Sequence, residues 1–122
     1  MSFKIKAIDH IQLAAPKGSE EEAKRFFYGI LGMKEIDKPE SLKNRGGVWF
    51  EFGPYQIHVG IEEPFFPAKK AHPAFAVESI EALKQHLINN GVPVTEDHRI
   101  PDVVRFHTSD PFGNRLEFLE RV

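Results

Sequence analysis

The 122-residue chain contains no cysteine. This absence excludes disulfide bridges, thiolate metal ligands and a cysteine nucleophile, and it fits an intracellular protein. The first six residues carry charge and no apolar run follows them, so no signal peptide is expected. We therefore expect a cytoplasmic location.

Long apolar runs and an excess of basic residues are also lacking. No stretch approaches the roughly 20 apolar residues that a membrane helix needs, so no membrane partner is expected. The formal net charge is −2 and the pI is about 6.3, whereas a nucleic-acid-binding domain usually has a basic face. The glycine patterns of nucleotide-binding loops and hydrolase elbows are missing as well. What remains is one globular domain, with an ordinary 41% of hydrophobic residues.

The order of predicted elements occurs twice along the chain. In each half an apolar strand precedes a helix with one apolar stripe, and the helix ends at a glycine, Gly32 or Gly91. Ser19 and Glu22 have the spacing of a capping box at the start of the first helix. Three strand-like runs follow each helix, so both halves predict the order β-α-β-β-β. The predicted strands are residues 7–15, 34–37, 47–52 and 55–61, then 72–77, 92–95, 103–108 and 116–119.

Four side chains able to bind metals occupy equivalent positions in the two halves. His10 and His72 lie on the first strand of their halves, and His58 and Glu117 lie on the last. Side chains alternate between the faces of a strand, and this alternation places all four on the face away from the helices. A curled sheet would bring them around one hollow. Histidine and carboxylate ligands suit borderline and hard divalent cations, so the four predict a metal site.

At this point the sequence resembles a known family over essentially its whole length. Residues 8–13, 23–33 and 72–77, and above all the Asp-Pro-Phe-Gly-Asn-Arg-Leu-Glu run at 110–117, look like the vicinal-oxygen-chelate superfamily of glyoxalase, bleomycin-resistance and dioxygenase proteins. The resemblance implies an α+β fold of two tandem βαβββ modules, about residues 1–63 and 70–122. It also implies a curled mixed sheet around a metal and substrate cavity, and a homodimer.

The resemblance also implies a ligand set. Glyoxalase I and its relatives take ligands from positions that match His10, His58, His72 and Glu117, for a divalent ion such as Zn, Ni, Mn or Fe. Fosfomycin-resistance relatives use three, matching His10, His72 and Glu117. Glyoxalase I usually has Glu where this chain has His58, which leaves Glu117 as the set's only carboxylate and the expected catalytic base. We expect His58 to ligate; the alternative is that it hydrogen-bonds a ligand or substrate.

Three further residues are candidates for substrate binding. Arg105 and His107 share a strand face that the repeat directs towards the hollow, where they would bind a substrate oxyanion or donate a proton. Gln12 shares the strand face of His10. On the strand at residues 47–52 the sequence leaves open whether Trp49 and Glu51 or their neighbours face the hollow.

The preferred function is that of a metal-dependent lyase or isomerase of glyoxalase-like type. Its small substrate would chelate the metal through vicinal oxygens, the metal would act as a Lewis acid, and Glu117 would move a proton. One alternative is an antibiotic-resistance protein that transfers a thiol to an epoxide antibiotic or sequesters a drug without metal; the retained His and Glu residues argue against sequestration. Another is a ring-cleaving dioxygenase, although extradiol members are usually longer. The sequence leaves open whether one site is shared between two chains.

Overall fold

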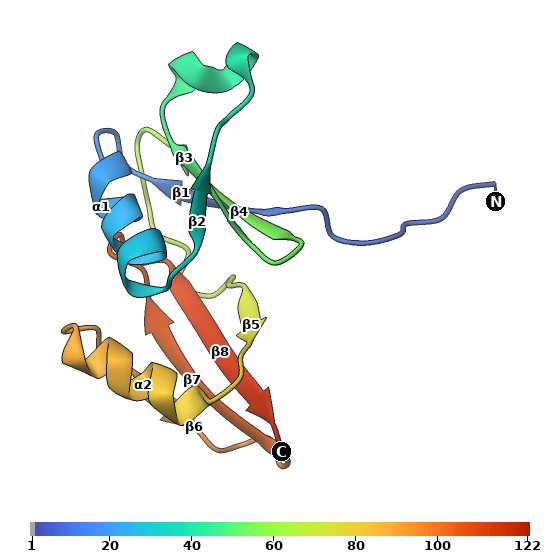
Figure 1. The fold of residues 1–122 in the computed structure, drawn as a ribbon, viewed down its shortest axis with the longest axis vertical. Helices are drawn as coiled ribbons and strands as arrows, with labels where there is room; N and C mark the ends of the chain where they lie inside the picture. Colours follow the sequence, from blue (N-terminus) through green and yellow to red (C-terminus); the bar gives the residue numbers. More distant parts are fainter. Residues whose placement is uncertain (1) are drawn as a thin grey trace.

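Two four-stranded sheets, each with helix packed on one face, make up the protein (Figure 1). The structure is a computed structural model that describes residues 2–122. The first module contains β1 (Ile11–Ala15), α1 (Glu20–Lys24), its π-helical continuation η1 (Arg25–Ile30), β2 (Lys34–Ile36), the 3-10 helix η2 (Glu40–Arg45), β3 (Val48–Phe52) and β4 (Tyr55–Ile61). The second contains β5 (Ala74–Ala76), α2 (Ile80–Asn89), β6 (Thr95–Asp97), β7 (Val103–Ser109) and β8 (Arg115–Arg121).

The strand order repeats between the two sheets. It is β1-β4-β3-β2 in the first sheet and β5-β8-β7-β6 in the second. In each sheet the first pair is parallel and the other two are antiparallel. The α+β fold of two βαβββ modules is thus confirmed. Within residues 2–122 the two sheets stay separate, so β1 and β5 are both edge strands.

The core lies between each sheet and its helix. On β4, Ile57 and Val59 point inward while His58 points to the opposite face, as the alternation predicts. Phe27 of η1 and Phe50 of β3 are fully buried, and their rings pack with centroids 5.4 Å apart. Burying such an aromatic side chain stabilises the fold by about 1.5–3 kcal/mol.

The predicted C-terminal ends of the two helices are found in the structure, but the predicted cap at the start of the first helix is not. Gly32 and Gly91 have φ angles of 76° and 75°, the left-handed conformation that favours glycine after a helix. The predicted capping box is wrong, because Ser19 makes no side-chain capping hydrogen bond and its buried hydroxyl has no partner. Its backbone, at φ −96° and ψ 4°, lacks the extended conformation that an N-cap residue usually adopts. The carboxylate of Glu20 instead accepts a hydrogen bond from the Gly47 amide, before β3.

Two predicted strand boundaries shift in ways that affect the site. His10 and His72 lie just before β1 and β5 rather than within them. The strand predicted at residues 92–95 is found at 95–97, since the Val92 amide bonds to the Leu87 carbonyl and closes α2. Pro93 has no amide hydrogen to give to a sheet.

A buried asparagine ties the two modules together. The Asn114 side chain is 2% exposed and donates from Nδ2 to the Ala14 carbonyl oxygen of β1, at 2.8 Å, and to Asp110 Oδ2, also at 2.8 Å. Its Oδ1 accepts a hydrogen bond of 3.0 Å from the Ala68 amide in the linker. The turn that precedes β8 is thereby fixed to the first module and the linker at once.

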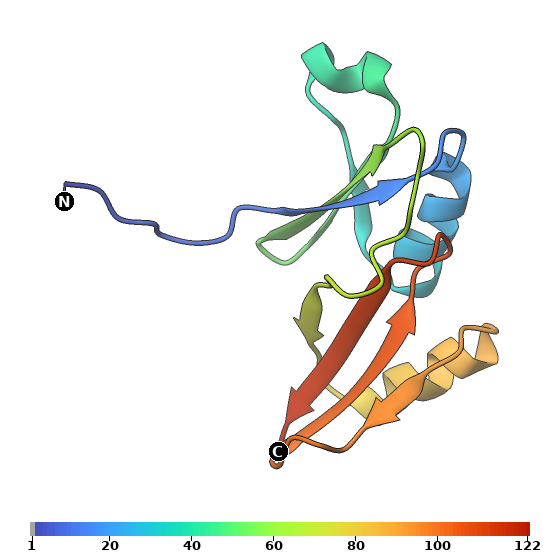
Figure 2. The ribbon, with the colours of Figure 1, turned by 180° about the vertical axis from the view of Figure 1, so that it is seen from behind.

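The N-terminal segment before β1 projects away from the rest of the chain in both views (Figures 1 and 2). Its apolar side chains Phe3, Ile5 and Ile8 are 69%, 85% and 77% exposed. Among residues 2–122, the longest helices fall well short of the length and apolarity that crossing a membrane requires.

Candidate metal centre

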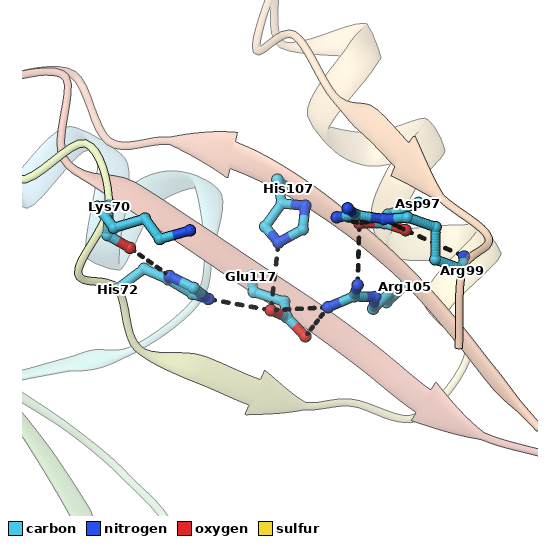
Figure 3. A network of polar contacts seen from close by, with 7 residues as sticks. All are labelled: Lys70, His72, Asp97, Arg99, Arg105, His107 and Glu117. Atoms are coloured by element: carbon cyan, nitrogen blue, oxygen red, sulfur yellow. Dashed lines mark hydrogen bonds and ion pairs between the residues drawn. The ribbon is translucent and has the colours of Figure 1, made fainter. Parts of the chain in front are cut away.

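Three side chains of the second module converge on one point (Figure 3). His107 on β7 is directly paired in register with Glu117 on β8, and His72 lies two residues before Ala74, whose register partner is also Glu117. The potential ligand atoms of these three residues all lie within 4.8 Å of one another. Pairing in the sheet therefore places two imidazoles beside one carboxylate.

The contacts of His72 show which of its ring nitrogens faces Glu117. Its Nδ1 lies 2.9 Å from the Lys70 carbonyl oxygen, which only accepts, so Nδ1 carries the proton. In the neutral ring Nε2 then has a lone pair, which is directed at Glu117 Oε1 across 3.0 Å. Two acceptors face each other unless the ring is protonated or a metal ion lies between them. A metal-binding histidine typically donates its other ring N–H to a carbonyl in this way.

Glu117 is held as a carboxylate although it is only 7% exposed. Burial acts to raise the pKa of Glu117, but the side-chain contacts with His72 and Arg105, together with the charge of Arg105, outweigh burial and lower it. Arg105 Nη1 lies 3.4 Å from each carboxylate oxygen, and its Nη2 donates to Asp97 Oδ2 at 2.9 Å. Arg99 also binds Asp97 and holds the pKa of that carboxyl far below its usual range.

His107 Nε2 lies 3.2 Å from Glu117 Oε1, the oxygen that also faces His72. The side chain of His107 is 11% exposed. Burial lowers the pKa of His107, with a contribution from the charge of Arg115, which favours the neutral form that a metal ligand needs.

The other two predicted ligands lie together on the first module. His58 is buried between Trp49 and His10, with ring centroids 3.6 Å from Trp49 and 4.2 Å from His10. His58 Nε2 lies 2.8 Å from Gln56 Oε1, and His10 Nδ1 lies 2.9 Å from Asp9 Oδ2. Burial lowers the pKa of His58. The stack also shows that Trp49, and not Val48 or Phe50, faces the same side as the predicted ligands His10 and His58.

The predicted set of four is thus divided between the two sheets. In the part of the chain that the structure describes, the one group of three His or carboxylate residues within ligating distance is His72, His107 and Glu117, without His10 or His58. Gln12 is exposed on β1 and, with His72, lines a cavity of about 500 Å³ between the modules. Arg105 lies beside Glu117, with its guanidinium already bound by two carboxylates.

Sequence reasoning missed Asp97, which anchors Arg105. The strand pattern alone did not give this contact, because Asp97 lies opposite Arg105 only when the strand extends to residue 97. The prediction ended that strand at Thr95, two residues early. Sequence reasoning also missed the ring stack of His10, His58 and Trp49, since alternation fixes a strand face but not which rings meet on it.

Comparison with known proteins identifies the family. The model of the Glyoxalase/Bleomycin resistance protein/Dioxygenase superfamily matches residues 7–118. The chain belongs to this superfamily. A crystal structure of a protein from Bacillus anthracis, described as of the glyoxalase family, is 56% identical, with a TM-score of 0.97 over 100% of both chains. No curated protein matches significantly.

More distant members of the superfamily share the fold. The fosfomycin resistance protein FosX of Listeria monocytogenes, solved with Mn(II) and 1S,2S-dihydroxypropylphosphonic acid, is 18% identical, with a TM-score of 0.80 over 98% of this chain and 95% of that one. Lactoylglutathione lyase from Agrobacterium tumefaciens is 19% identical, with a TM-score of 0.75 over 95% and 94%. The superfamily thus includes metal-binding resistance proteins and lyases on this architecture.

Proposed function

We propose that the protein is a divalent-metal-dependent enzyme of glyoxalase-like type. Its substrate is a small molecule that binds the metal through two neighbouring oxygens, and a lyase or isomerase reaction is preferred. The observation that carries the proposal is the opposition of His72 Nε2 and Glu117 Oε1 across 3.0 Å, with the proton of His72 held at Nδ1 by the Lys70 carbonyl. Two imidazoles and a carboxylate suit Zn, Ni, Mn or Fe.

The two carboxylate oxygens of Glu117 have different neighbours, which supports a different role for each. Oε1 faces His72 and His107 and would hold the ion, which supplies Lewis-acid polarisation of the substrate oxygens when bound. Within residues 2–122, the one hydrogen-bond partner of Oε2 is Arg105. Because Oε2 does not face the two histidines, it would be the oxygen that takes a proton from the substrate. Arg105, fixed by Asp97, keeps the carboxylate in this orientation.

The second half of the site would come from a second copy of the chain. His10 and His58 lie on the first sheet, apart from His72 and Glu117. Within residues 2–122, β1 and β5 each have one edge that pairs with no other strand. The free backbone N–H and C=O groups of such an edge can pair with a strand of another chain. The exposed Phe3, Ile5 and Ile8 lie on the segment that leads into β1. A homodimer that joins the first module of one copy to the second module of the other would cover these features and place His10 near the metal.

Metal analysis of protein purified without chelators tests the proposal. We expect about one divalent ion per chain in the native protein, and much less in His72→Ala and Glu117→Gln, because each removes a converging ligand. His98→Gln is the matched control, since His98 lies in the same module with a 79% exposed side chain. If both site variants keep the native metal content, the proposal is wrong.

One observation favours a second candidate. His58 is stacked between two rings and bonded to Gln56, which favours the three-ligand set of His10, His72 and Glu117 that resembles fosfomycin-resistance relatives. The candidate reaction is thiol transfer to an epoxide antibiotic. A His58→Ala variant with Co²⁺ bound distinguishes the sets, because loss of a ligand changes the Co²⁺ absorption spectrum. An unchanged spectrum, with affinity reduced less than about tenfold, supports the three-ligand candidate.

A further inference from the structure

We propose that His107 is a metal ligand, supplied by the same chain as His72 and Glu117. The inference rests on the metal site proposed above and adds a residue to it. The ligand set implied by the family resemblance does not include His107, and the sequence suggested it only for substrate binding. The three residues together form a set of two histidines and one carboxylate within a single module.

The distances match those between ligands of one ion. His72 Nε2 lies 3.0 Å from Glu117 Oε1, and His107 Nε2 lies 3.2 Å from the same oxygen. Two ligands bound about 2.1 Å from an ion lie about 3.0 Å apart at a right angle and about 3.4 Å apart at the tetrahedral angle. The rings of His72 and His107 lie edge to face, with centroids 5.6 Å apart and planes inclined at 82°. The ligand atoms of all three residues lie within 4.8 Å of one another.

The alternative is that His107 merely donates a hydrogen bond to Glu117. Counting the partners of Oε1 argues against it. The imidazole nitrogens of His72 and His107 both lie beside Oε1, at 3.0 and 3.2 Å, and neither has a described hydrogen bond with Oε2, whereas Arg105 Nη1 lies 3.4 Å from each oxygen alike. A carboxylate seeking donors would share them between its oxygens, each of which has about two acceptor sites. Two imidazole nitrogens beside one oxygen, and neither beside the other oxygen, is the arrangement expected when both rings and that oxygen bind a common cation.

The strand pairing makes the position of His107 hard to change. His107 and Glu117 are register partners on β7 and β8, and Thr95 of β6 pairs with His107 from the other side. The backbone of His107 is therefore held on both sides, and its side chain must face the same way as Glu117. A ligand on such a central strand is positioned before the metal arrives.

A ligand set within one chain has a consequence for assembly. Three protein ligands on an octahedral ion leave about three positions open, enough for two substrate oxygens and His10 of a second copy. One chain would then retain the metal by itself, and the second copy would complete the site. Removal of His107 should therefore weaken metal binding more than removal of His10.

Titration of metal-stripped protein with Co²⁺ tests the assignment. The variants are His107→Gln, which keeps an N–H group that can donate to Glu117 but is a poor ligand, His10→Gln for comparison, and His98→Gln as the exposed control. We expect His107→Gln to lower the Co²⁺ affinity more than about 100-fold, beyond the range for groups that only orient a ligand. We also expect the Co²⁺ absorption spectrum to change. His98→Gln should match the native protein, and His10→Gln should lose less than His107→Gln. A His107→Gln loss of about 100-fold or less, or an unchanged spectrum, would overturn the assignment.

Two further measurements separate a failure of the metal site from a failure of the His107 assignment. If the native protein binds no Co²⁺, or if Glu117→Gln binds it normally, the proposed metal site itself fails; a loss with Glu117→Gln but not with His107→Gln rejects only the present inference. Addition of Zn²⁺ to the unmutated, ¹⁵N-labelled protein gives a readout that does not depend on the folding of any variant. The Nε2 resonance of His107 should shift to that of a metal-bound nitrogen, and an unshifted resonance at saturating Zn²⁺ would contradict the assignment.

Discussion

Replacing Asn114 tests how the turn before β8 holds the fold together. The change Asn114→Ala removes both Nδ2 hydrogen bonds and the Oδ1 contact with the Ala68 amide. Asp110 Oδ1 keeps two backbone donors, the amides of Phe112 and Asn114, but Asp110 Oδ2 loses the Asn114 donor and has no other in the described hydrogen bonds. A buried carboxylate oxygen is thus left without a partner.

The expected loss follows from these contacts. A hydrogen bond contributes about 0.5–1.5 kcal/mol net, and a buried group left unsatisfied costs about 1–3 kcal/mol. Ala68 is exposed, so water can replace its partner, whereas Asp110 is 5% exposed. We therefore expect Asn114→Ala to lower the free energy of unfolding by about 2–4 kcal/mol.

The nearly isosteric change Asn114→Asp adds a dependence on pH. It places a second carboxyl where Nδ2 now lies 2.8 Å from Asp110 Oδ2, and burial already raises the pKa of Asp110. Two carboxyl groups this close cannot both be ionised, so the folded variant keeps one proton on the pair. The unfolded chain releases that proton at about pH 4. Stability of the variant therefore falls as pH rises above about 4, by about 1.4 kcal/mol per unit until the folded pair ionises.

Urea unfolding followed by fluorescence of the single tryptophan measures both effects. Asn44→Ala is the control, because Asn44 is exposed in η2 and should change stability by less than about 0.5 kcal/mol. A loss below about 0.5 kcal/mol for Asn114→Ala, or an Asn114→Asp penalty that does not vary with pH, would refute this account of the turn.

Three other changes test the fold. Phe26→Ala, at a buried site, should cost about 3–5 kcal/mol, while Tyr28→Ala, at a 63% exposed one, should cost less than about 0.5; equal losses in urea unfolding would mean that the apolar stripe is not core. Glu20→Gln should be destabilising near neutral pH, because the hydrogen bond from the Gly47 amide stabilises the ionised Glu20 and lowers its pKa. That stabilisation is lost as pH falls through the pKa of Glu20, so the difference between the variant and the native protein should disappear at low pH. A penalty that stays constant with pH would exclude this linkage. Gly47→Ala should cost more than about 2 kcal/mol, because its φ is +85° and a Cβ would overlap the Val59 carbonyl oxygen, whereas Gly53→Ala, in open space at φ +55°, should cost about 1. Similar melting temperatures for the two variants would argue against the close approach.

The repeated module could be predicted from the sequence because its signals are local. Apolar residues alternate on β4 and recur at helical spacing before Gly32, and the second half places Gly91 and Glu117 in the same order. Alternation also placed His58 correctly on the face opposite Ile57 and Val59.

Contacts between strands and between modules could not be predicted from these local patterns. The partner of Arg105 depends on where β6 begins, and Pro93 and the closure of α2 move that strand towards Asp97. The Gly-Asn pair was interpreted only as a turn former, but Asn114 is a buried link to Ala14, 100 residues away in sequence. Whether two residues on equivalent strands meet depends on how two sheets pack, which no pattern within one strand records. That is why the predicted set of four separates into two groups.

We propose that a divalent ion binds at His72 and Glu117 and that a second copy of the chain completes the site. Anomalous diffraction from crystals loaded with Co²⁺ tests it most directly. We expect one strong peak per chain within about 2.5 Å of His72 Nε2 and the Glu117 carboxylate, with His10 of a second copy facing it. A peak bound by other residues, no peak at all, or His10 of the same chain at the ion would contradict the account.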